Sequence, residues 1–149
     1  MPTDPLYKSD FYAWTLHQAT LLREGDIAEL DPDNLAEEVE SLGRSQQREL
    51  ESRLHVLLMH LLTWCYQPTH RRQGRSWRST IRTQRLELGL LLRDNPSLRP
   101  RLATLLVERY PGACTYAADE TGLPRATFPH LCPWSVEQVL EEGFWPENF

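Results

Sequence analysis

Lysine is almost missing from this sequence: Lys8 is the single lysine among sixteen basic residues, and the other fifteen are arginines. The lysine-containing, glycine-rich loop that cradles phosphates does not occur, and neither does Gly-x-Gly-x-x-Gly or Gly-x-Ser-x-Gly. No catalytic motif is recognisable, so the sequence does not predict a class of enzyme.

Cysteines and histidines are too sparse to suggest a metal site. Cys65, Cys114 and Cys132 are odd in number and include no Cys-x-x-Cys pair, which argues against a disulfide framework or a zinc site. His55 and His60 are five residues apart, which places them on different faces of a helix, and no Glu-x-x-His or His-x-x-x-His pattern occurs. We expect reduced, mostly buried thiols and predict no metal and no cofactor.

Long apolar runs and targeting signals are also missing. The most apolar stretch, 54–62, contains two histidines and is far shorter than the roughly 20 residues that cross a bilayer. The first residues have neither the basic start nor the apolar run of a signal peptide. We therefore expect a cytoplasmic protein that does not enter a membrane.

What is present is a globular composition with a helical pattern. The 149 residues, 40% of them apolar and 25% charged, fit one domain spanning 1–149. Apolar residues recur every three or four positions, and no alternating run demands a strand. The pattern predicts an all-α fold: a helical bundle built on a long antiparallel helix hairpin, with an aromatic- and proline-rich C-terminal tail and a short final helix. The expected helices cover about 9–24, 32–66, 76–94, 97–110, 113–120 and 135–142, the last opened by a capping box at 135–138.

The helix expected at 32–66 is the dominant element. Asp31-Pro32 is a strong start, because a capping carboxylate precedes a proline at the first helical position. From Leu35 to Cys65, the residues that follow one another at steps of three or four along one face are apolar, with the exception of Gln46. This long seam predicts a helix that packs along much of its length.

Capping residues, glycines and prolines mark the expected helix ends and interruptions. Asp10, or Ser9 before it, is expected to cap the first helix, which should stop at Gly25. Gly43 leaves two alternatives for the long helix, a continuous rod or a kink or short break. Ser97 is expected to cap a fourth helix, and Pro111 with the following glycine should break or sharply kink it.

Five separated segments together are similar to a known bacterial family. In this combination and order, the chain resembles the family called domain of unknown function 29 over about residues 6–146. The resemblance implies an all-helical bacterial protein. It brings no assigned activity, substrate or cofactor, so no functional residue is carried over. The five segments are 10–14, 34–45, 60–68, 75–81 and 132–135.

Charge is segregated along the chain. Residues 24–51 include ten acidic residues, whereas 52–86 include seven arginines and no acidic residue. Four of these arginines step by three, four and three, which places them along one side of a helix; we call them the arginine stripe. They are Arg75, Arg78, Arg82 and Arg85. Because like charges at this spacing repel, something acidic is expected to face the stripe.

Three partners are consistent with the arginine stripe: the acidic tail helix, the acidic segment of a second subunit, and a phosphate group. The tail helix carries Glu137, Glu141 and Glu142. In the expected hairpin, Arg82 lies near His60 and Arg85 near Leu57. The acidic half of the long helix would then be roughly 25–30 Å further along a straight rod.

Arg53 and His60 carry the enzymatic alternative. They share a helix face and faintly resemble the arginine–histidine motif of some prokaryotic ribonucleases, in which arginine binds a phosphate and histidine moves a proton. Trp77 and the other tryptophans could stack bases, although core packing is their commoner use. The net charge of −5 argues against broad affinity for nucleic acid.

From the sequence we therefore predict a protein-interaction or structural module that self-associates or binds an unknown protein partner. Its candidate binding residues are the arginine stripe and Trp77. The alternative, not favoured, is a nucleic-acid-binding protein or ribonuclease that uses Arg53, His60 and the arginine stripe.

Overall fold

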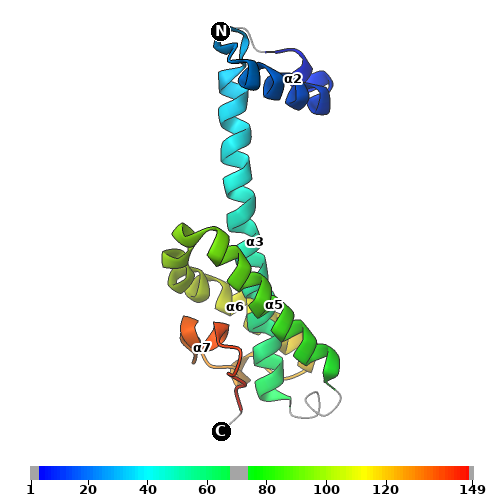
Figure 1. The fold of residues 1–149 in the computed structure, drawn as a ribbon. Coiled ribbons are helices and arrows are strands. Elements are labelled where there is room, and N and C mark those ends of the chain that lie inside the picture. Colours follow the sequence, from blue (N-terminus) through cyan, green and yellow to red (C-terminus); the bar gives the residue numbers. More distant parts are fainter. Residues whose placement is uncertain (1–3, 68–73, 148–149) are drawn as a thin grey trace. The chain divides into compact units, whose positions relative to one another are not determined.

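The computed structural model describes residues 4–67 and 74–147, and it contains two compact units, 1–45 and 46–149 (Figure 1). Every regular element within the described ranges is a helix, which confirms the all-α prediction. The unit boundary falls inside α3 (Pro32–Tyr66), which is continuous through Gly43. The predicted alternative of a break there is wrong, because one mid-helix glycine costs only about 1 kcal/mol relative to alanine. That the two units fold as one domain stays a prediction.

Unit 1 is built from α1 (Leu6–Ser9), α2 (Phe11–Glu24), the 3-10 helix η1 (Ile27–Glu29) and the start of α3. Asp10 caps α2 by accepting a hydrogen bond from the backbone N–H of Ala13 at 3.0 Å. Gly25 ends α2 with a φ of 73°, the left-handed conformation that glycine adopts without strain. The predicted cap and stop are confirmed, and the separate short helix α1 was not predicted.

The core of unit 1 is small and half polar. Its buried side chains among the described residues are Trp14, Gln18, Leu21 and Asp31. The Asp31 carboxylate accepts hydrogen bonds from the Trp14 indole at 3.1 Å and the Asn34 side-chain amide at 2.8 Å. Its backbone N–H donates to Gln18 Oε1 at 2.9 Å. The residue predicted to start α3 therefore also ties α2 to it.

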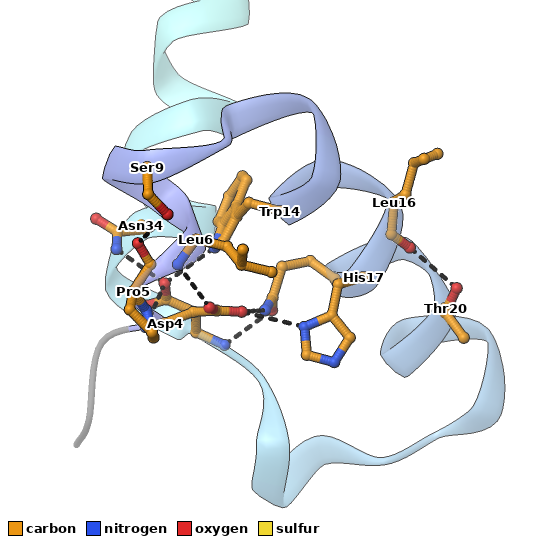
Figure 2. Close-up of polar contacts among 11 residues, drawn as sticks. Asp4, Pro5, Leu6, Ser9, Trp14, Leu16, His17, Thr20 and Asn34 are labelled. Atoms are coloured by element: carbon orange, nitrogen blue, oxygen red, sulfur yellow. Dashed lines mark hydrogen bonds and ion pairs between the residues drawn. The ribbon is translucent and has the colours of Figure 1, made fainter.

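Asp4 extends this polar network (Figure 2). Its backbone N–H donates to the Asp31 carboxylate, and its own carboxylate accepts from the backbone of Leu6 and contacts the His17 ring at 3.1 Å. Burial raises the pKa of Asp31, but hydrogen bonds from Asn34, Trp14 and the Asp4 backbone outweigh it and leave the pKa below its usual value. The backbone hydrogen bond from Leu6, followed by that from His17, lowers the pKa of Asp4.

Unit 2 confirms the predicted antiparallel hairpin, formed by the C-terminal half of α3 and by α5 (Arg75–Asp94) (Figure 1). Arg53 Nη1 donates to Gln84 Oε1 at 3.3 Å, and the His60 ring lies 4.7 Å from the Trp77 ring, centroid to centroid, in a tilted contact. Trp77, five residues before Arg82, thus occupies the place beside His60 that was predicted for Arg82. The position of the turn alone does not determine which residues of α3 and α5 lie side by side. This register also depends on how the aromatic rings and the core side chains pack.

The third long helix of unit 2, α6 (Leu102–Thr121), follows the 3-10 helix η2 (Pro96–Arg101). The predicted cap at Ser97 is wrong, because η2 starts before it and shows no side-chain cap. The predicted break at Pro111 is also wrong, since α6 continues through it. Tyr110, Ala113 and Cys114 on either side are buried, so core packing offsets the missing N–H of the proline.

The tail contains the 3-10 helix η3 (Arg125–Thr127) and the short helix α7 (Val136–Leu140). Phe128 is buried in the core of unit 2, so the proline-rich segment of the tail packs against the helices of this unit. Ser135 and Gln138 form the predicted capping box, each side chain bonding to the other's backbone N–H. No helix in the described part of the chain is long and apolar enough to span a bilayer.

Candidate functional site: the arginine stripe and its surroundings

The four residues of the arginine stripe all lie on α5, but they differ in exposure. Arg75, Arg78 and Arg82 are exposed, whereas Arg85 is only 6% exposed. Arg85 therefore belongs to the packed side of α5, beside Ile81 and Leu88. The four arginines lie on one helix, as predicted, but only three of them are exposed on the surface.

Arg85 binds the backbone of the tail. Its guanidinium donates to three carbonyls: Nε to Val139 at 2.8 Å, Nη1 to Glu142 at 3.4 Å and Nη2 to Phe144 at 2.7 Å. Burial lowers the pKa of Arg85, and the negative charges of Glu141 and Glu142 act in the opposite direction. A planar guanidinium has N–H donors in a fixed fork, and this geometry suits three carbonyls that lie within residues 139–144 of the tail.

Trp145 lies among three members of the stripe. Its ring centroid is 5.6 Å from the guanidinium carbon of Arg78, 5.7 Å from that of Arg82 and 5.5 Å from that of Arg85. The Trp145 ring also contacts the Trp64 ring in a tilted arrangement, with 4.9 Å between the centroids. Positive charge over an aromatic face is attracted by the ring. Sequence reasoning did not single out Trp145, and the signal available was an aromatic residue close to the acidic tail helix.

The exposed arginines have no acidic partner in the part of the chain that the structure describes. Arg78 and Arg82 contact aromatic rings, and no ion pair joins either of them, or Arg75, to a described carboxylate. The tail predicted as an acidic partner thus supplies carbonyls and an indole in place of carboxylates. Among the described residues, three guanidinium groups of the stripe therefore have no carboxylate partner.

Arg53 and His60, the ribonuclease candidates, have separate environments. Arg53 contacts Glu49 at 2.9 Å and Glu87 at 3.8 Å as well as Gln84. His60 Nδ1 donates to the Val56 carbonyl at 2.8 Å, because a carbonyl can only accept. Seven residues correspond to about 10 Å of helix rise, and no contact in the structure joins the two side chains. Among the described residues, no group of three or more metal-binding side chains occurs.

Unit 1 exposes much of its apolar surface. It holds seven of the eleven large apolar side chains that are exposed among the described residues. It also carries ten acidic residues against three basic ones, while unit 2 has eleven acidic and thirteen basic residues. The exposed apolar side chains of unit 1 are Phe11, Tyr12, Leu16, Leu22, Ile27, Val39 and Leu42.

Fold and surface together define an all-helical protein with an acidic, apolar N-terminal unit and an arginine-bearing helical bundle. The family model described as "Domain of unknown function DUF29" matches residues 6–145, and the chain belongs to this family. Neither the curated proteins nor the solved structures contain a match to the chain.

Proposed function

We propose that this protein is a self-associating interaction module, in which the acidic unit 1 of one copy docks on the exposed arginines of a second copy. The observation that carries the proposal is the composition of unit 1's surface, which joins an excess of seven negative charges to seven exposed large apolar side chains. Contiguous apolar surface rimmed by polar residues marks interaction sites, and the proposal is that the exposed side chains of unit 1 are covered in this way by the second copy.

Unit 1 has a physical need for a partner. It comprises 45 residues and buries only Trp14 and Leu21 as apolar side chains among the described residues. Domains below about 40 residues usually need a disulfide, a metal or association to be stable, and unit 1 is only slightly larger than this limit. A second chain that covers Val39 and Leu42, which are 66% and 69% exposed, would supply the missing apolar burial.

The exposed part of the arginine stripe supports a second copy as that partner. Two acidic units would repel each other, so pairing unit 1 with unit 1 is disfavoured electrostatically. Arg75, Arg78 and Arg82 instead offer positive charge without a described acidic partner, next to the apolar ring of Trp145. Opposite charges across an interface fix orientation and favour the correct partner.

Light scattering on the full chain tests the proposal directly. Wild type should have twice the 17.4 kDa chain mass at about 200 μM, a concentration at which a micromolar Kd gives mostly dimer. Arg78→Glu/Arg82→Glu should give the monomer mass. The matched control is Arg99→Glu/Arg101→Glu, which makes the same charge change at exposed positions of η2 and should leave the dimer intact.

A charge-swapped pair identifies the two surfaces. Glu37→Arg/Glu40→Arg reverses exposed charges on unit 1 and should be monomeric alone. Mixed with Arg78→Glu/Arg82→Glu, it should form a heterodimer, because both contacts are again between opposite charges. A monomeric wild type refutes self-association. A wild-type dimer that survives both reversals refutes the assignment of the surfaces.

A further inference from the structure

A separate cavity lies in unit 2, where α3, α5 and α6 meet. Its volume is about 240 Å³, and its wall includes His60 and Thr63 from α3, Thr80 from α5, and Tyr116 and Glu120 from α6. It is smaller than the roughly 300–1,000 Å³ of sites for drug-sized ligands. The cavity therefore suits a compact molecule.

Three polar side chains of this wall, His60, Thr63 and Thr80, already donate a hydrogen to a backbone carbonyl of their own helix. His60 Nδ1–H donates to the Val56 carbonyl at 2.8 Å, which leaves Nε2 for another partner, toward which it is an acceptor when it carries no proton. The Thr63 hydroxyl donates to the Met59 carbonyl at 3.0 Å, and the Thr80 hydroxyl donates to the Ser76 carbonyl at 2.9 Å. Each hydroxyl, and the His60 ring when Nε2 carries no proton, can therefore offer only lone pairs to a ligand.

The charge of the wall has one sign. Glu120 contributes a carboxylate that has no ion pair with a described residue, and no lysine or arginine is among the described residues that line the cavity. Tyr116, about half exposed, and Trp77 add aromatic rings. A ligand that uses these three acceptors together with the Glu120 carboxylate must therefore bring hydrogen-bond donors and positive charge. Among the described lining residues, an anion such as phosphate would find no cation and no free donor hydrogen on Thr63 or Thr80.

We propose that this cavity binds a small organic ammonium ion, with the N–H donors of a primary amine on the acceptors of His60, Thr63 and Thr80. Glu120 neutralises the charge of the ligand, and the aromatic rings pack against its short carbon chain and attract the cation. The proposal does not depend on self-association, since every residue it uses lies in unit 2 of one chain.

Met59 provides a local reporter, because it lines the cavity and the chain has only one other methionine, Met1. The full chain is labelled with ¹³C in the methionine methyl groups and titrated with n-butylammonium chloride up to about 50 mM, which covers a millimolar Kd. The Met59 methyl signal should shift saturably. Butan-1-ol and sodium butyrate, of the same length but neutral or anionic, should cause no saturable shift.

Glu120→Gln should weaken butylammonium binding about tenfold, because the carboxylate that attracts the ammonium ion becomes a neutral amide. Glu108→Gln is the matched control, since it makes the same change at an exposed position of the same helix and should bind as wild type. No saturable Met59 shift in wild type overturns the proposal. Equal binding of butan-1-ol, or unchanged affinity in Glu120→Gln, also overturns it, because the cavity would then select shape without charge.

Discussion

Replacing Arg85 tests how the tail is held on α5. In Arg85→Ala, the tail loses three hydrogen bonds from one buried guanidinium, two of them short at 2.8 and 2.7 Å. Hydrogen bonds to a charged group contribute about 1.5–3 kcal/mol each, so the two short ones sum to about 3–6 kcal/mol. Removing a buried cation returns part of this, because the charge no longer has to be desolvated. We expect a net loss of about 2–4 kcal/mol from the free energy that holds the tail.

Two measurements separate a loose tail from a globally unfolded bundle. Urea denaturation reports the free energy of unfolding of the whole unit, and hydrogen exchange reports the opening of 139–146 alone. If the tail opens independently, Arg85→Ala raises exchange in 139–146 and leaves the core of α3, α5 and α6 protected. If the tail is part of the cooperative unit, Arg85→Ala lowers the urea midpoint of unfolding and raises hydrogen exchange in the core helices as well as in the tail.

Two variants show whether the fork or the charge matters. Arg85→Lys keeps the charge but lacks the planar set of donors, so it should lie between wild type and Arg85→Ala. Arg82→Ala removes an exposed side chain whose described contact is the Trp145 ring, and it should cost only about 0.5–1 kcal/mol. The reasoning fails if Arg85→Ala stays within about 0.5 kcal/mol of wild type with unchanged exchange in the tail.

Two further predictions concern unit 1 and α3. Because the folded-state pKa values of Asp4 and Asp31 lie below the unfolded value near 3.8, their stabilisation is present above about pH 4 and is lost as pH falls through the folded values. The protection of unit 1 amides, measured as the exchange rate relative to that of an unfolded chain at the same pH, should fall below pH 4 in wild type. This protection should depend less on pH in Asp31→Asn. Gly43→Ala should stabilise α3 by up to about 1 kcal/mol in thermal unfolding, since a Cβ there meets no atom within 4 Å. Gly25→Ala, at a φ of 73°, should destabilise by about 1 kcal/mol.

The ends of α3 and α5 were predictable because they depend on local chemistry. Asp31-Pro32 starts α3, and the helix ends at Tyr66, two positions before Pro68 in the sequence. The continuity of α6 through Pro111 was not predictable, since the packing that keeps the helix intact involves residues far away in the sequence. An example is the close packing of α6 on α3, where a Cβ at Gly112 would lie 3.5 Å from the His55 ring.

The candidate site was predictable only as a row of like charges. Periodicity placed Arg75 to Arg85 on one helix, but it does not say which of them is buried. The partners of Arg85 are backbone carbonyls, and a carbonyl has no signature in an amino-acid sequence because every residue carries one. The acidic tail helix was therefore one of three predicted partners of the stripe, while the nature of the contact and the role of Trp145 were not predicted.

The seam of α3 shows what an amphipathic pattern can and cannot specify. Its apolar steps are uniform from Leu35 to Cys65, yet Leu50 and the following seam residues are buried while Val39 and Leu42 are exposed. The pattern states that a helix face favours an apolar partner, and it is silent on whether the same chain provides one. In unit 2 the partners are α5 and α6. In unit 1 the described residues leave Val39 and Leu42 uncovered.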